Sequence, residues 1–196
     1  MKFMTNCFKF AVPFALCALT FGVTNANAGV KNLPLSISLT TVETLGAPVQ
    51  PDGTPCPNGT AFGGQTAGTG TISIGSGKKI YSGPVFGNAT DCATATLQFS
   101  NGKLTLIAAN GDRLTATYYG SFMQRASGST EYVINSGAFA ITGGTGYFAG
   151  ASGSGQLQGT ENIPLSGPPF TGTLKAVGNI SFSKNAFEQA YDMQQQ

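Results

Sequence analysis

The sequence contains no histidine and little charge, and both shortages restrict the chemistry available to the protein. None of the 196 residues is histidine, and only 9% are Asp, Glu, Lys or Arg. Without histidine, a Ser-His-Asp or Cys-His arrangement for nucleophilic catalysis is impossible. Zinc sites built on histidine are excluded for the same reason. We therefore expect neither a metal site nor a cofactor.

The first 28 residues predict an export signal. Lys2 and Lys9 make the start of the chain positive, and residues 10–23 form an apolar or small-residue run without charge. Ala26 and Ala28 are small residues at the positions that a signal peptidase requires, so cleavage is expected after Ala28. The apolar run is shorter than the roughly 20 residues that span a membrane. The mature protein is accordingly expected in the periplasm or outside the cell.

Cleavage at this site leaves a neutral domain of about 168 residues, a size typical of a single domain. Loss of Lys2 and Lys9 reduces the ten basic residues to eight, which balance the eight acidic ones. A neutral, sparsely charged surface does not attract nucleic acid or an anionic membrane. We expect no nucleic-acid partner and no membrane span in the mature chain.

Two of the four cysteines, Cys56 and Cys92, remain after cleavage. Both lie in segments rich in turn-forming residues, 48–60 and 87–95. In an oxidising compartment such a pair predicts a disulfide. Two cysteines cannot form a tetrahedral site made of cysteine alone. The bridge would stabilise the fold by about 3–4 kcal/mol according to the chain-entropy model.

The remainder of the chain has the pattern of an all-β protein. Short segments of alternating hydrophobicity are separated by glycine and asparagine turns, and Asn101-Gly102 and Asn110-Gly111 are typical of tight hairpins. Eight such strands could close into an antiparallel barrel, which leaves no exposed sheet edge, or form a β-sandwich, and periodicity alone does not separate the two. The expected strands are 36–45, 69–81, 93–99, 103–108, 113–122, 130–142, 152–160 and 170–182.

These patterns divide the chain into four parts. After the signal peptide at 1–28, residues 29–67 hold an N-terminal strand and a long loop. This loop, 46–68, has no strand pattern and is expected to be pinned by Cys56. The core of the barrel is expected at 68–182, and residues 183–196 form a polar tail, either a short helix or a frayed end.

A glycine-rich segment, residues 141–155, contains Gly144-x-Gly146-x-x-Ala149, which matches a dinucleotide-binding fingerprint. That fingerprint binds phosphate only when a helix begins at the glycines. Here the following residues are again rich in glycine and then alternate, so no helix is expected. We interpret the segment as a tight crossing between strands, with Tyr147 and Phe148 closing one end of the barrel.

Glu43 and Glu131 lie in strand patterns and are the acidic residues most suited to face a cavity. Tyr118 and Tyr132 could supply further polar contacts to a ligand there. For each of the four, ordinary packing or a solvent-facing strand position is the alternative. The other acidic residues are expected to be solvated: Asp52, Asp91 and Asp112 in turns, Glu161 at a strand end, and Glu188 and Asp192 in the tail.

Two segments together carry a resemblance to a known superfamily. AANGDRLTATYYG at 108–120 and GAFAITGGTGYFAGASGSGQLQG at 137–159 resemble the allene oxide cyclase and dirigent-like barrels, in particular their small exported bacterial members. The similarity covers about 68–182. It implies an eight-stranded antiparallel barrel with an apolar interior, often a trimer in the plant members. The matching motifs are turns and glycines, so they transfer a fold and no catalytic residues.

The resemblance and the composition leave several functions open. The first is a non-catalytic barrel that binds a small apolar ligand or serves as an extracytoplasmic interaction protein. The alternative is a cofactor-free cyclase or isomerase that confines a reactive apolar substrate, as the plant members do. The Gly/Thr/Ser-rich composition also suggests a surface-assembly subunit. A lumen filled by side chains would exclude a ligand, whereas an open lumen with a buried, unpaired Glu43 or Glu131 would favour catalysis.

Overall fold

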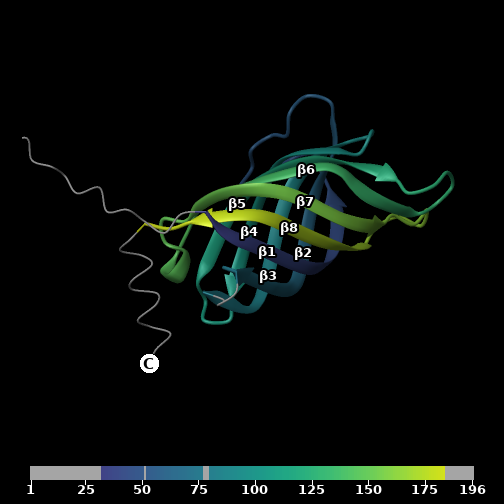
Figure 1. Ribbon diagram of the computed structural model, residues 1–196. Helices are drawn as coiled ribbons and strands as arrows, with labels where there is room; N and C mark the ends of the chain where they lie inside the picture. Colours follow the sequence, from purple (N-terminus) through teal and green to yellow (C-terminus); the bar gives the residue numbers. More distant parts are fainter. Residues whose placement is uncertain (1–31, 51, 77–79, 184–196) are drawn as a thin grey trace, which may run out of the picture.

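The computed structural model is a closed barrel of eight antiparallel strands (Figure 1). It describes residues 32–50, 52–76 and 80–183. Each strand pairs with the next along the chain, and the last pairs with the first, so the barrel is confirmed and the sandwich is not formed. The elements are β1 Leu33–Gly46, β2 Thr60–Ile74, β3 Tyr81–Thr94, β4 Gln98–Ala108, β5 Arg113–Gln124, β6 Glu131–Gly144, the 3-10 turn η1 Gly146–Phe148, β7 Ser152–Asn162 and β8 Phe170–Ser181.

Two predicted segments are not covered. The export signal at 1–28, with its cleavage at Ala28, lies outside the described residues, as does the tail 183–196 except for its first residue. Among the described residues, no helix has the length and apolar character needed to cross a membrane.

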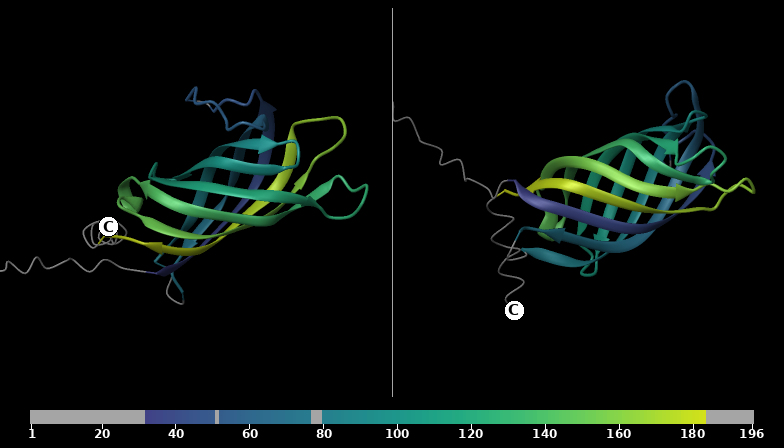
Figure 2. Two further views of the ribbon diagram at one scale, coloured as in Figure 1. Left: turned by 90° about the horizontal axis from the view of Figure 1, so that it is seen from above. Right: turned by 45° about the vertical axis from the view of Figure 1, so that its right-hand side comes forward.

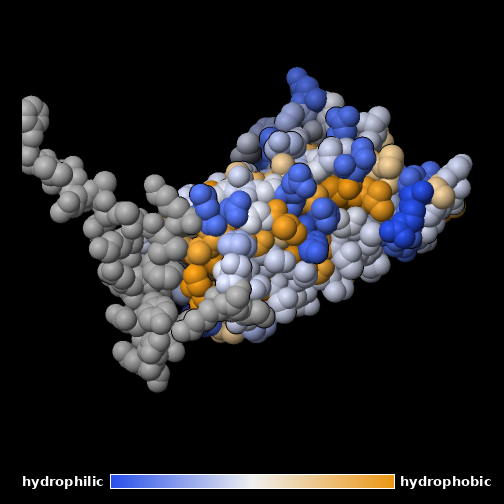
Figure 3. Space-filling view, viewed as in Figure 1, coloured by the Kyte–Doolittle hydropathy of each residue, from blue (hydrophilic) through white to orange (hydrophobic). Residues whose placement is uncertain are grey.

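Side chains alternate between the lumen and the outer surface along each strand. On β1, Leu35, Ile37, Leu39 and Thr41 are buried, whereas the residues between them are more exposed. This period of two follows from the pleat of the strand. The strands run obliquely to the barrel axis (Figure 2), as closure of a sheet into a barrel requires. Polar and apolar residues are interspersed on the outer surface over β1, β7 and β8 (Figure 3).

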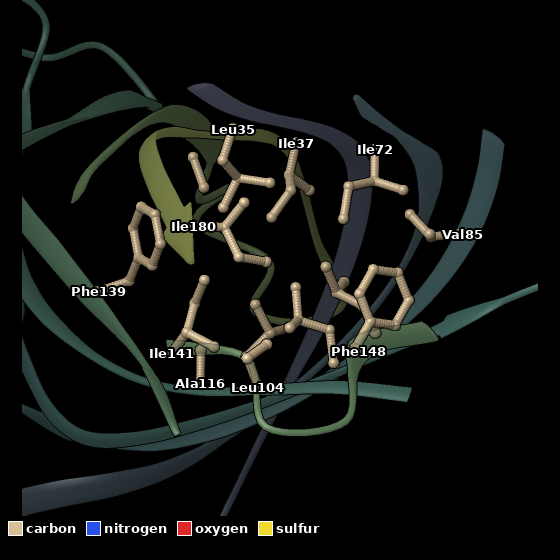
Figure 4. Packing of buried hydrophobic residues seen from close by; sticks show 14 of the residues in the cluster. Leu35, Ile37, Ile72, Val85, Leu104, Ala116, Phe139, Ile141, Phe148 and Ile180 are labelled. Atoms are coloured by element: carbon tan, nitrogen blue, oxygen red, sulfur yellow. The ribbon is translucent and has the colours of Figure 1, made fainter. Parts of the chain in front are cut away.

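One half of the lumen is filled by apolar side chains (Figure 4). Residues from all parts of the sheet meet there, among them Ile72, Phe139 and Ile180. Tyr147 and Phe148 of η1 close this end, 4% and 1% exposed, which confirms the expected plug. The start of β1 and the end of β8, which pair with each other, lie at this end of the barrel, on the left in Figure 1.

Asp112 holds the plug in position. Its Oδ2 accepts hydrogen bonds from the backbone N–H of Tyr147 at 2.9 Å and from Nδ2 of Asn110 at 2.8 Å. Gly146, with φ +53°, lies so close to this carboxyl group that a Cβ would overlap it. Asp112 therefore joins the β4–β5 turn, which Asn110-Gly111 forms as predicted, to the plug.

The hairpin predicted at Asn101-Gly102 is wrong. β3 continues to Thr94, the turn is at residues 95–97, and Asn101-Gly102 lies inside β4. There the register shifts against both neighbouring strands, which is a β-bulge. Asn101 has φ +53°, a conformation that asparagine tolerates in a bulge as well as in a hairpin turn. The strand expected at 93–99 is consequently the end of β3, a turn and the start of β4.

The long loop is shorter than predicted. β2 begins at Thr60, so the connection between β1 and β2 covers only residues 47–59. The predicted disulfide is present between Cys56 and Cys92, with Cα atoms 5.7 Å apart. Cys92 lies in β3 and not in a loop. Nε2 of Gln50 donates to the backbone oxygen of Asn101 at 2.8 Å, so the loop is fixed against the β4 bulge.

Candidate functional site

The other half of the lumen is not filled. An inner cavity of about 60 Å³ borders the apolar core, and an outer chamber of about 300 Å³ lies at the open end of the barrel, called the mouth below. The outer chamber is lined by the end of β1, the turn at 95–97 and the β7–β8 connection, so it lies opposite the plug. The two spaces share five lining residues: Glu43, Asp91, Phe99, Phe122 and Glu161.

Three carboxyl groups form the boundary between these spaces. Glu161 comes from β7, Glu43 from β1 and Asp91 from β3, so each acid is separated from the next by one intervening strand. Both intervening positions are glycine in register: Gly172 is opposite Glu161, and Gly64 is opposite Asp91. At Gly64 the absence of a side chain leaves room for acids of the two neighbouring strands, whereas a Cβ at Gly172 would meet the backbone of Thr160 and Glu161.

Gly64 shows how little space remains. A Cβ at this position would lie 2.5 Å from Oε1 of Glu43 and 2.6 Å from Oδ1 of Asp91, well inside van der Waals contact. The two carboxyl groups therefore occupy the space above Gly64, one from each neighbouring strand. Any residue larger than glycine would force them apart.

Tyr118 of β5 completes the cluster, separated from Asp91 by the one intervening strand β4. Its ring lies over Gly102, where a Cβ would be 2.6 Å from the ring atoms. Its hydroxyl donates a hydrogen bond of 2.8 Å to Oδ2 of Asp91. The bulge that contains Gly102 thus gives Tyr118 room to reach from β5, past β4, to the acid on β3.

Glu43 and Glu161 interact directly, and both are hard to ionise. Burial raises the pKa of Glu43 well above its usual range, and a hydrogen bond with Glu161 and the charge of Glu161 raise it further. Burial also raises the pKa of Glu161, which is 7% exposed, while the hydrogen bond with Glu43 opposes this rise. Two adjacent buried carboxyl groups cannot both ionise cheaply. Glu43 is the protonated partner, and it donates to the Glu161 carboxylate.

Asp91 is the third member and differs from the pair. Burial raises its pKa to about 7, although the hydrogen bond from Tyr118 acts in the opposite direction. The residue is 8% exposed. Its Oδ1 has no hydrogen-bond partner among the described residues. Asp91 lines both the inner cavity and the outer chamber, and its Oδ1 is available there to accept a hydrogen bond from a ligand.

The remaining walls are mainly apolar. The outer chamber is surrounded by four phenylalanines, Phe62, Phe99, Phe122 and Phe170. Leucine, isoleucine, proline and a few small residues complete its wall. Four threonines and several aliphatic residues line the inner cavity. None of the described lysine and arginine residues lines either space, so this part of the chain supplies no positive counter-charge to the acids.

Of the four residues predicted from the sequence, the structure brings two together. Glu43 and Tyr118 belong to the cluster, whereas Glu131 and Tyr132 line neither space. Glu131 forms an ion pair of 3.3 Å with Arg125, and its side chain is 42% exposed. Tyr132 is opposite Glu161 in the β6–β7 register and is half-buried.

Asp91 and Glu161 were expected to be solvated, and both expectations are wrong. Asp91 lies within β3, and Glu161 is buried one residue before the end of β7. The sequence contains a signal for Asp91, since Val85, Gly87, Ala89 and Asp91 alternate along one face of β3. The predicted strand at 93–99 begins after Asp91 and leaves Asp91 in a turn. The alternation in β3 was therefore not used to predict its burial.

Within the described part of the chain, no three His, Cys, Asp or Glu residues are arranged to hold a metal ion. Comparisons with protein-family models, with curated proteins and with solved structures find no match to this chain. The resemblance to the allene oxide cyclase and dirigent-like superfamily therefore stays a prediction.

Proposed function

We propose that this barrel binds a small, mostly apolar molecule in the outer chamber and holds the polar group of that molecule against the carboxyl cluster. The observation that carries the proposal is the chamber itself. A volume of about 300 Å³ is at the lower end of the range for ligand pockets. Its phenylalanine walls and few convergent polar groups are typical of such pockets.

The two spaces have different roles in this proposal. The inner cavity of about 60 Å³ has room for a few water molecules only. The apolar part of a ligand therefore fits in the outer chamber, and its polar end reaches Asp91, Glu43 or Glu161 at the boundary. The disulfide supports a role outside the cytoplasm, because such bridges persist in oxidising compartments.

Binding is tested with a neutral fluorescent probe, N-phenyl-naphthylamine, whose emission increases in apolar surroundings. We expect saturable binding to the wild-type protein. The Ala93→Phe variant fills the chamber and should abolish this binding, because Ala93 lines the mouth. Ala140→Phe, on the exposed outer face of β6, is the matched control and should bind normally. Equal binding by the wild type and Ala93→Phe would rule out the chamber.

A cofactor-free isomerase or cyclase is the second candidate, favoured by the spread of pKa values in the cluster. Glu43 stays protonated at neutral pH, whereas the pKa of Asp91 is about 7. Carboxyl groups with separated pKa values, one near the working pH, are suited to acid and base roles.

The ring of nitrobenzisoxazole opens when a base removes its ring proton. This compound therefore tests for a catalytic base without knowledge of the natural substrate. If Asp91 is a base, the protein should exceed the rate of free acetate, and the rate should rise through about pH 7. The Asp91→Asn variant should lose about 100-fold of the rate, the lower end of the usual contribution from general base catalysis. A rate no higher than that of acetate would leave binding as the only function supported.

A further inference from the structure

We infer that the ligand of this chamber is a cationic amine joined to an apolar group, with its ammonium lying among Asp91, Glu161 and Glu43. This inference rests on the proposed function, since it names the polar group that the carboxyl cluster would hold. Charge, unmet hydrogen bonding and the aromatic walls each point to an ammonium.

Charge complementarity is the first argument. Among the described residues, four titratable groups line the two spaces: Glu43 from β1, Asp91 from β3, Tyr118 from β5 and Glu161 from β7. None of these four is basic. The described basic side chains that form ion pairs, Lys103 and Arg125, do so with Asp52 and Glu131 at exposed positions. A buried acidic site without its own counter-charge is most strongly stabilised by a ligand that brings one.

Hydrogen bonding is the second argument. Oδ1 of Asp91 is buried and without a partner among the described residues, and an unmet buried acceptor is costly. The position above Gly64 brings this atom close to Oε1 of Glu43. A primary ammonium has three N–H donors and no acceptor, whereas an alcohol has a single donor. An ammonium can therefore satisfy several carboxyl oxygens at once.

The chamber walls supply the third argument. Phe62, Phe99, Phe122 and Phe170 line the space in front of the acids. The faces of aromatic rings attract cations and also pack against apolar groups. The same wall can thus accommodate both parts of an amphiphilic amine.

Proton release distinguishes a cation from a neutral ligand. An opposite charge nearby lowers the pKa of a carboxyl group. Because the pKa of Asp91 is about 7 before binding, an ammonium would expel its proton at neutral pH. A neutral ligand of the same shape adds no charge and would leave the carboxyl protonated or raise its pKa further by excluding water.

The experiment compares three probes of similar shape: phenethylamine, phenethyl alcohol and hydrocinnamate. Each is titrated calorimetrically into the wild-type protein at pH 7, and proton release is followed with an indicator dye in lightly buffered solution. We expect the amine to release protons and to bind at least about tenfold more tightly than the alcohol, since a close charge pair in a buried site contributes at least that much. The anionic hydrocinnamate should bind most weakly.

The Asp91→Asn variant should lose about tenfold in affinity for the amine and keep its affinity for the alcohol. Glu131→Gln, on the outer surface, is the control and should change neither. Equal affinities for amine and alcohol would overturn the amine inference and leave the proposed binding function intact. Binding of none of these probes or of N-phenyl-naphthylamine would overturn both. The comparison on the wild-type protein remains decisive if Asp91→Asn does not fold.

Discussion

At the scale of single residues, the site depends on acids whose ionisation is unfavourable in the folded protein. Asp91 is buried with one unpartnered oxygen, and Glu43 and Glu161 share a proton. A carboxyl group with a raised pKa holds its proton in the folded state at a pH where the unfolded chain has already lost it. Its stabilising contribution is therefore present at low pH and lost as the pH rises through the folded pKa.

This predicts a stability that declines between about pH 4 and pH 7, the interval between the ordinary pKa of 3.8 and the raised pKa of about 7 of Asp91. Each unit of difference corresponds to about 1.4 kcal/mol at most. The Asp91→Asn variant cannot ionise, so its free energy of unfolding should vary less with pH and should exceed that of the wild type at pH 8. Urea denaturation at several pH values measures this.

Glu131→Gln should keep the pH profile of the wild type, because Glu131 is exposed on the outer surface. An unfolding free energy of the wild type that rises from pH 5 to pH 8 would contradict the assignment of a raised pKa to Asp91.

Gly64 allows a second residue-scale prediction. In Gly64→Ala, the added methyl group would overlap the carboxyl oxygens of Glu43 and Asp91. We expect a loss of about 1–3 kcal/mol in the free energy of unfolding, typical of overpacking, together with weaker binding of N-phenyl-naphthylamine. Thermal denaturation and probe titration measure the two effects.

Gly83→Ala is the matched control in a neighbouring strand. A Cβ there has its nearest contact at 3.6 Å, an ordinary van der Waals distance. It should be neutral or slightly stabilising, because alanine restricts the unfolded chain more than glycine does. Similar losses in both variants would show that the effect at Gly64 is a general cost of replacing glycine.

At the scale of elements, the connection at 47–59 and the bulge in β4 shape the site from outside the barrel. The disulfide joins the connection to Cys92, which directly follows Asp91 in β3. Gln50 binds the bulge through Asn101, and the bulge gives room to Tyr118 through Gly102. Two irregular segments thus position the two partners of the Tyr118–Asp91 hydrogen bond.

Removing the disulfide with the double change Cys56→Ala and Cys92→Ala should lower the free energy of unfolding by about 3–4 kcal/mol and leave the barrel folded. The bridge spans 36 residues, and its loss releases the unfolded chain from that constraint. Guanidinium denaturation of both proteins gives the difference. Reductant should destabilise the wild type and leave the double variant unchanged; labelling of either cysteine by an alkylating agent without reductant would contradict the bridge.

At the scale of the whole molecule, stability and binding are separated along the barrel axis. The plugged half contains the packed core, and the open half contains the cavities and buried acids. Packed apolar contacts stabilise a fold, whereas buried acids and unfilled space do not. The closed hydrogen-bonded sheet joins the two halves, so the packed core of the plugged half stabilises the open half as well.

Two phenylalanine truncations test this separation. Phe148→Ala, in the plug and 1% exposed, should cost about 3–5 kcal/mol in the free energy of unfolding. Phe122→Ala, half-buried at the mouth, should cost less than half as much, because it already borders a cavity, but should weaken probe binding. Chemical denaturation ranks the two variants. Equal costs would mean that the mouth is packed as tightly as the core.

Local patterns were sufficient to predict much of the fold. Alternating hydrophobicity identified the strand β1, the glycine-rich segment at 141–155 identified the plug, and Asn110-Gly111 identified a turn. Asn101-Gly102 was misassigned because a bulge and a hairpin demand the same backbone conformations. Only the pairing of β4 with β3 and β5 distinguishes them.

By itself, the sequence determined the all-β class, the disulfide pair, and the lack of histidine chemistry, since these depend on residue types and on periodicity along the chain. Tertiary structure alone decided the site. Glu43, Asp91, Tyr118 and Glu161 come from four strands, and their meeting depends on barrel closure, on register, and on glycines across the intervening strands. Burial, which raises the pKa values of these acids, is likewise a property of the closed barrel and not of any segment.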